Sequence, residues 1–203
     1  MDVIIYIHGK NGKSSEAEEY KKLFPSLDVV GLDYKTFTPW ETRIEIKEAV
    51  NNLKIIYKNV ILIANSIGAF FSMCADIEEE ITHAYFISPI VNMEKLISNM
   101  MSWANVTESE LKQKGKIKTD FGEELSWDYL CYVRDNPIKW SVRTDIIYGS
   151  NDNLTSIDTI NYFVNAHNAS LTIMQDGEHW FHTEKQVKFL NNWIKEKLNR
   201  ICF

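Results

Sequence analysis

The fold of this chain is decided by one stretch of sequence, VILIANSIG at positions 60–68. Its first four residues, Val60–Ile63, are all apolar, and such runs favour strands that are buried on both faces of a parallel sheet. Ser66 then lies between two small residues, at positions 64 and 68, directly before the stretch Ala69–Ala75, which we expect to be helical. This pattern predicts a tight strand-to-helix turn that projects the Ser66 hydroxyl beyond the carboxyl end of the strand.

Five further short runs resemble the first strand. Each spans four or five residues and is rich in β-branched or aromatic side chains. The six predicted strands are Val3–Ile7, Asp28–Gly31, Val60–Ile63, Ala84–Ile87, Asp145–Tyr148 and Leu171–Met174. Because longer amphipathic stretches separate them, we predict an α/β fold with a doubly wound, mostly parallel sheet of about six strands.

Helix-start signals occur between the predicted strands. Ser15-Glu16-Ala17-Glu18 matches a capping box, and Thr38-Pro39 places a proline at the first helical position. Further helices are expected to begin at Thr155 and at Thr183, the last of them running to about Asn199.

A long segment, from Ile90 to Trp140, interrupts this alternation of strands and helices. Thr107 and Ser126 each begin a helix-start pattern within it. We therefore predict one domain, residues 1–203, with a small helical insertion at residues 90–140.

Composition excludes several classes of protein. Among 203 residues, 45% are hydrophobic and 25% charged, which is typical of a compact soluble domain. The net charge of −6 argues against nucleic acid or an anionic membrane as a partner. We expect no signal peptide and no membrane span. Scattered cysteines without metal spacing indicate reduced thiols in the cytoplasm, at Cys74, Cys131 and Cys202. The oligomeric state stays open.

Three other chemically capable segments each follow a predicted strand. His8-Gly9-Lys10 follows the first strand, and the amides of Lys10 and Ile67 can donate to a developing oxyanion. Asp152 follows the fifth strand, and His179 follows the sixth. Because parallel strands place their carboxyl ends at one edge of the sheet, we expect these groups to meet there.

Two other ligand types are less consistent with the sequence. Gly9–Ser14 resembles a phosphate-binding loop, but the first glycine of that motif would fall at Ile7. His179 and His182 lack further zinc ligands at suitable spacing. We therefore expect no cofactor and no metal, and nucleotide binding at Gly9–Ser14 is kept only as an alternative.

The order of these groups along the chain identifies a family resemblance. An oxyanion loop, then Ser66, Asp152 and His179, resembles a small α/β-hydrolase over essentially the whole chain. The resemblance implies a serine nucleophile, an aspartate that orients the histidine base, and backbone donors at Lys10 and Ile67. It also implies that the insertion is a cap, and that the chain begins at the family's third strand.

Two residues depart from the family pattern. Ala64 replaces the first glycine of G-x-S-x-G, and Lys10 is unusual beside an oxyanion hole. Neither change removes a reacting group, so the departures bear on the substrate rather than on the reaction.

The resemblance implies a hydrolase that acts through an acyl-enzyme. The insertion is rich in apolar and aromatic side chains, which either attach it to the main body or line an apolar pocket; a pocket favours a small-molecule carboxylic ester with a short acyl or aryl group. The predicted pocket residues are Asn11, Asn65, Met93, Trp127 and Trp180. A thioesterase, or a hydrolase of small peptides or amides, remains open on the same three residues. A non-catalytic ligand-binding protein of the same fold is the alternative from another class.

Overall fold

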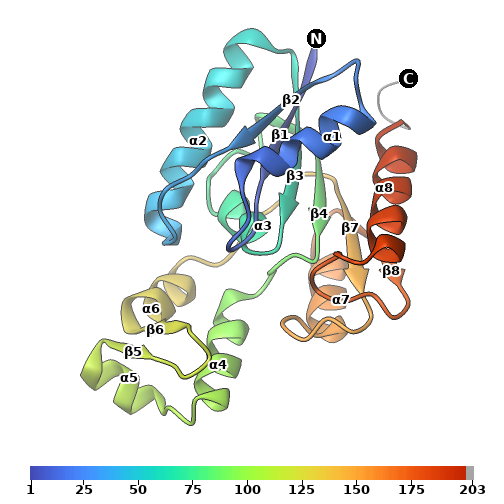
Figure 1. The fold of residues 1–203 in the computed structure, drawn as a ribbon. Coiled ribbons are helices and arrows are strands. Elements are labelled where there is room, and N and C mark those ends of the chain that lie inside the picture. Colours follow the sequence, from blue (N-terminus) through green and yellow to red (C-terminus); the bar gives the residue numbers. More distant parts are fainter. Residues whose placement is uncertain (200–203) are drawn as a thin grey trace. The chain divides into compact units, whose positions relative to one another are not determined.

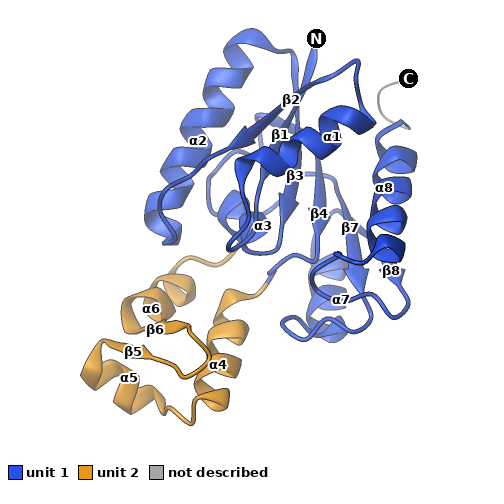
Figure 2. Cartoon of the chain, in the orientation of Figure 1, with its two compact units in different colours: residues 1–91, 140–203 blue, residues 92–139 orange. Residues whose placement is uncertain are grey.

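The computed structural model describes residues 1–199, and the chain forms two compact units (Figures 1 and 2). Unit 1 contains Met1–Val91 and the chain from Trp140 onward, and unit 2 is Asn92–Lys139. The predicted insertion, residues 90–140, therefore differs from unit 2 by two residues at its start and one at its end.

The centre of unit 1 is a parallel sheet of six strands in the order β2-β1-β3-β4-β7-β8 (Figure 1). The predicted α/β fold class is confirmed, and each predicted strand is present. The strands are β1 (Asp2–Ile7), β2 (Asp28–Leu32), β3 (Asn59–Asn65), β4 (Ile81–Ile87), β7 (Thr144–Gly149) and β8 (Ala169–Met174).

Helices cover both faces of this sheet (Figure 1). The connection from β1 to β2 runs toward one edge of the sheet, and the later connections run toward the other edge. Because such crossovers are right-handed, α1 covers one face of the sheet and α2, α3 and α7 cover the other. Helix α8 packs on the same face as α1. The elements are the 3₁₀ turn η1 (Ser14–Glu16), α1 (Ala17–Leu23), α2 (Pro39–Ile56), α3 (Ile67–Met73), α7 (Ile157–Ala166) and α8 (Glu184–Asn199). Across residues 1–199, no helix combines the length and apolarity that a membrane crossing requires.

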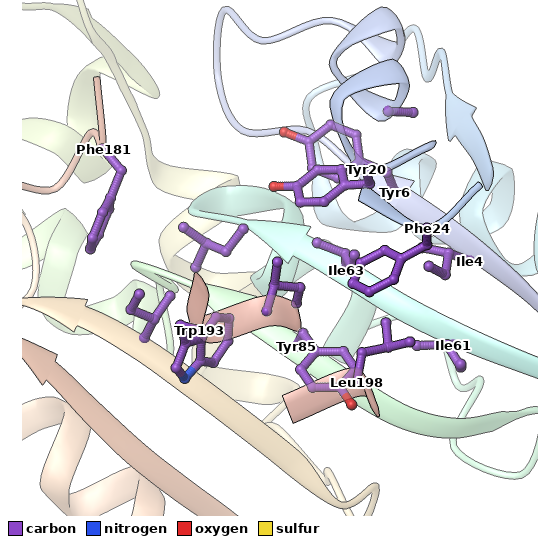
Figure 3. Close-up of a cluster of buried hydrophobic side chains, with 14 of the residues drawn as sticks. Ile4, Tyr6, Tyr20, Phe24, Ile61, Ile63, Tyr85, Phe181, Trp193 and Leu198 are labelled. Carbon is purple, nitrogen blue, oxygen red and sulfur yellow. The ribbon is translucent and has the colours of Figure 1, made fainter. Parts of the chain in front are cut away.

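Alternate side chains of each central strand pack against the helices. Tyr6 and Ile63 belong to a cluster with Tyr20 of α1 and Trp193 of α8 (Figure 3). Their neighbours along the strands are equally buried but face the other way, which explains why the central strands are continuously apolar. Burial of each large apolar side chain contributes about 1.5–3 kcal/mol to the free energy of unfolding.

The helix starts agree with the sequence in part. Thr38 is the residue before α2 and Pro39 its first residue, as expected. The capping box at Ser15 is wrong, because the Glu16 side chain accepts a hydrogen bond from the backbone N–H of Lys13 and η1 precedes α1. Helix α3 begins two residues earlier than expected, since the turn at Ser66 leads into it directly.

Unit 2 is less purely helical than predicted. Thr107 and Ser126 cap helices as expected, but a two-stranded antiparallel hairpin lies between those helices. Arg134 donates to Glu94 and Glu108, which joins all three helices of the unit. The elements are α4 (Met93–Trp103), α5 (Glu108–Lys114), β5 (Lys116–Lys118), β6 (Glu124–Ser126) and α6 (Trp127–Asp135).

Two cysteines, Cys74 and Cys131, are free thiols, and Cys202 lies outside the described residues. Burial raises the pKa of the Cys74 thiol to about 12. This thiol therefore stays protonated and is a poor nucleophile at neutral pH.

Candidate active site

Ser66 occupies a strained turn between β3 and α3. Its backbone has φ 52° and ψ −120°, a combination that costs a non-glycine residue about 1–3 kcal/mol. Strand β4 and the loop after it hold this conformation: Ser66 N–H donates to Ile87 O at 2.9 Å, and Ile90 N–H donates to Ser66 O at 3.1 Å. The turn thus aims the hydroxyl away from both the strand and the helix.

Close packing explains the small residues on either side of Ser66. A Cβ atom at Gly68 would lie only 2.5 Å from the carbonyl oxygen of His8, so no larger residue fits there. Ala64 is fully buried at the end of β3. The turn therefore requires glycine at position 68, and the small residue at position 64 fits a site without room at the surface.

The side chains of Ser66, His179 and Asp152 form one continuous hydrogen-bonded path. Ser66 Oγ lies 2.8 Å from His179 Nε2, and His179 Nδ1 lies 2.7 Å from Asp152 Oδ2. Because an ionised carboxylate only accepts, Nδ1–H is the donor to Asp152, and Nε2 of the neutral ring accepts the Ser66 proton. Asp152 is fully buried and His179 is 15% exposed. The arrangement can move a proton from the serine to the histidine.

Asp152 is held by its own turn after β7. Its second oxygen, Oδ1, accepts from the backbone N–H groups of Leu154 at 2.8 Å and Thr155 at 3.0 Å. Burial raises the pKa of Tyr148, and the charge of Asp152 raises it further, so the Tyr148 hydroxyl keeps its proton and donates to Thr155 O. These bonds leave Oδ2 of Asp152 directed at the histidine.

The loops after β7 and β8 are fastened to each other. Asn151 N–H donates to Gly177 O at 2.8 Å, and Asp176 N–H donates to Ser150 Oγ at 2.8 Å. A Cβ atom at Gly149 would lie 2.4 Å from Gly177 O, so only glycine allows this approach. The distance between the Asp152 and His179 loops is thus set by backbone contacts.

The loop after β1 reaches the same edge of the sheet. A Cβ atom at Gly9 would lie 3.1 Å from Ser66 Cβ, which places this loop against the serine. His8 is buried, its ring stacks on Tyr34 at 4.2 Å between centroids, and its Nδ1 bonds Gly9 O at 2.8 Å. The Tyr34 hydroxyl donates to His8 O at 2.8 Å. His8 therefore shapes the loop through its contacts with Gly9 and Tyr34.

Lys10 and Ile67 occupy the positions expected for oxyanion donors. Ile67 is the first residue of α3, and the first N–H groups of a helix have no acceptor within it. Lys10 follows Gly9 in the loop that lies against Ser66. Their function as an oxyanion hole stays a prediction.

Of the predicted pocket residues, three lie in unit 1. Asn65 ends β3 beside Ser66, Asn11 is exposed in the loop after β1, and Trp180 follows His179. Trp180 is 71% exposed and stacks on His182 at 4.7 Å between ring centroids. The other two predicted residues begin helices of unit 2, Met93 in α4 and Trp127 in α6. Their contact with substrate stays a prediction.

Sequence reasoning missed the residues that hold the loops in place. Tyr34 is 26 positions from the His8 carbonyl that it bonds, and Ser150 is 26 positions from Asp176. No local pattern marks either residue. Within the described part of the chain, no group of three or more His, Cys, Asp or Glu side chains could hold a metal ion.

Solved structures of α/β-hydrolases share this fold. Est1E from Butyrivibrio proteoclasticus has a TM-score of 0.77 at 14% identity, over 98% of this chain and 87% of its own, and it has also been solved with ferulic acid bound. Mouse alpha/beta hydrolase domain-containing protein 10 has a TM-score of 0.76 at 15% identity, over 98% and 90%. The Pyrococcus furiosus esterase PF2001 has 0.67 at 19%, over 98% and 82%. No protein-family model matches the sequence, and no curated protein matches it.

Proposed function

Because the chain has the α/β-hydrolase fold, we propose that it is a serine hydrolase that cleaves a carboxylic ester with a short acyl or aryl group. The observation that carries this proposal is the path from Ser66 Oγ through His179 to the buried Asp152, with both hydrogen bonds at 2.7–2.8 Å. A serine that only caps a helix needs neither a histidine acceptor nor a strained backbone.

The first half of the reaction acylates the serine. His179 Nε2 takes the Ser66 proton as Oγ attacks the ester carbonyl, and Asp152 stabilises the imidazolium that forms. The amides of Lys10 and Ile67 donate to the tetrahedral oxyanion, each lowering the barrier by roughly 3 kcal/mol. The imidazolium then protonates the leaving alcohol, and the acyl group remains on Oγ.

The second half returns the enzyme to its starting state. His179 takes a proton from water, which attacks the acyl carbonyl, and then returns that proton to Ser66 Oγ as the acid departs. These steps use only groups within unit 1.

The choice of an ester rests on two lines of support. Trp180, one of the predicted pocket residues, directly follows His179 and is exposed, and its aromatic side chain suits an apolar acyl or aryl group. Est1E, a neighbour in fold, has been solved with ferulic acid, which is an aryl acid. A thioester or amide would react by the same steps, so the rates with different leaving groups must show which kind of substrate is preferred.

A fluorophosphonate probe tests the reaction directly, because it phosphonylates only an activated serine. We expect one equivalent to react with the native protein and none with Ser66→Ala. The matched control is Ser98→Ala, which removes an exposed helical serine of unit 2 and should label fully. A panel of aryl acetates, aryl butyrates, acyl thioesters and aminoacyl amides then ranks the substrates, with short aryl esters fastest.

Absence of labelling in the folded native protein would contradict the proposal and favour a ligand-binding protein of the same fold. A rise in the unfolding temperature with ATP would instead support nucleotide binding at Gly9–Ser14. Faster turnover of thioesters or amides would keep the mechanism and replace the substrate.

A further inference from the structure

The carboxylate of Glu16 lies outside the Ser66–His179–Asp152 path and accepts hydrogen bonds from β1 and from the loop that follows it. Glu16 Oε2 accepts from the Tyr6 hydroxyl at 2.5 Å, and Glu16 Oε1 accepts from the backbone N–H of Lys13 at 3.1 Å. Asn65, the residue before Ser66, acts on the same Tyr6 hydroxyl, because a hydrogen bond from its side chain partly offsets the rise in the pKa of Tyr6. We call this set of four residues, Asn65, Tyr6, Glu16 and Lys13, the Glu16 link.

The two ends of the Glu16 link lie on the segments that carry the proposed oxyanion donors. Asn65 ends β3, two residues before Ile67. Lys13 ends the loop after β1, in which Gly12 N–H donates to Gly9 O at 3.1 Å and so braces the turn around Lys10. The two oxygens of the Glu16 carboxylate therefore bind residues next to the two segments that carry the Lys10 and Ile67 amides.

In the Glu16 link, the Tyr6 hydroxyl always donates and the Glu16 carboxylate always accepts. Burial raises the pKa of Tyr6 far above its ordinary value, and the hydrogen bond to Glu16 and its charge add to the effect, so the hydroxyl stays a donor. Figure 3 shows the Tyr6 ring against that of Tyr20, with both hydroxyls pointing to the same side. A charged acceptor shortens and strengthens such bonds. The strain of the turn at Ser66 also requires its surroundings to hold it in place.

We propose that Glu16 and Tyr6 are positioning residues, which hold the Lys10 and Ile67 amides at the separation that one oxyanion requires. This inference rests on the proposed function. The geometry of an oxyanion hole is demanding because donors must lie near 3 Å from an atom that exists only in the transition state. Loosening the link should therefore slow acylation and leave binding of the ester unchanged.

The test compares hydroxyl removal at two neighbouring tyrosines. We expect Tyr6→Phe to lower kcat and the rate of fluorophosphonate labelling about 10-fold, with KM within about twofold, because displaced donors lose part of their roughly 10²-fold effect. Tyr20→Phe is the matched control, since it removes a hydroxyl from the same cluster without breaking the link. We expect Tyr20→Phe to react at the native rate.

A second pair of variants keeps the test decisive if Tyr6→Phe does not fold. Glu16 is only half-buried at the surface. Glu16→Ala should slow labelling as Tyr6→Phe does. Glu16→Gln keeps one acceptor oxygen and so only one of the two bonds, and it should restore part of the rate. Combining Tyr6→Phe with Glu16→Ala should be no slower than either single change, because both break one link.

The outcomes separate this inference from the proposed function. Native-rate labelling of folded Tyr6→Phe or Glu16→Ala would overturn the inference alone. Equal slowing in Tyr6→Phe and Tyr20→Phe would also overturn it, because the effect would then reflect general loosening of the core. If the native protein itself fails to react, the proposed function falls and the inference falls with it.

Discussion

At the scale of single residues, Ser66 shows how local strain and chemistry are combined. Its φ of 52° lies in a region that glycine enters freely and other residues avoid. The bonds from Ile87 and Ile90 keep the residue there. The backbone conformation of Ser66 therefore lowers the stability of the fold, and the same conformation places the hydroxyl beside His179.

This strain predicts an order of stability among variants of Ser66. Both Ser66→Gly and Ser66→Ala lose the bond to His179, but only glycine relieves the backbone. We expect Ser66→Gly to be the more stable variant, with a free energy of unfolding about 1 kcal/mol higher than that of Ser66→Ala. Chemical denaturation of both variants measures the difference. Equal stability, or a more stable alanine variant, would show that the backbone is not strained.

At the scale of elements, a buried charged cluster joins four of them near the amino-terminal end of β7. Asp145 of β7 accepts from His83 of β4 at 2.8 Å, from Ser170 of β8 and from Lys197 of α8. Burial alone would raise the pKa of Asp145, but these hydrogen bonds hold it well below its usual range. The carboxylate therefore stabilises the packing of α8 against the sheet.

The depressed pKa of Asp145 predicts sensitivity to acid. Its stabilisation is complete above the unfolded value, near pH 4, and is lost as the pH falls from there toward the folded pKa. We expect Asp145→Asn to lower the free energy of unfolding by about 3 kcal/mol at pH 7, because His83 and Lys197 lose their charged acceptor.

Thermal unfolding between pH 7 and pH 2 measures this dependence. The native protein should lose stability more steeply below pH 4 than Asp145→Asn does. Parallel curves for the two proteins would show that Asp145 is not the group responsible.

Elements differ in how far the sequence predicts them. The six strands of the sheet are short, mostly apolar runs rich in β-branched or aromatic side chains, and this composition marks them. The hairpin of Lys116–Lys118 and Glu124–Ser126 has three residues in each strand and is mostly polar, so no such signal exists. Turn η1 was missed because a serine-based capping box at Ser15 matches the pattern equally well, and tertiary contacts of Glu16 decide between them.

The candidate site was predictable in position and not in detail. Parallel strands end at one edge of the sheet, so Ser66, Asp152 and His179 are all expected there, and the loops after β7 and β8 bring the three side chains into contact. The contacts of Tyr34 and of Glu16 arise from side chains that meet across the fold. Such contacts leave no periodic trace in the sequence.

At the scale of the whole molecule, each unit has internal contacts of its own. The cluster around Tyr6 and Trp193 is drawn entirely from unit 1. Unit 2 has its own hairpin and the bonds of Arg134. The hydrogen bonds of Ser66, His179 and Asp152 also lie wholly within unit 1.

This division predicts that unit 1 folds and reacts without unit 2. We expect a protein in which a flexible Gly/Ser linker replaces residues 92–139 to keep its far-UV circular dichroism and its reaction with fluorophosphonate, because the core and the site remain complete. The same deletion carrying Ser66→Ala is the control and should not react. Loss of the folded spectrum would mean that unit 1 depends on unit 2.

The hydrogen bond between Ser66 and His179 joins residues 113 positions apart, and β8, which carries the histidine loop, is the last strand of the sheet. Protein synthesis delivers the chain from its amino terminus at about 5–20 residues per second. The turn that holds the serine can thus form many seconds before the histidine leaves the ribosome. If the proposed function holds, a nascent chain of this protein would hold Ser66 in its turn without a base, and it would become reactive only after β8 pairs and the loop of His179 forms.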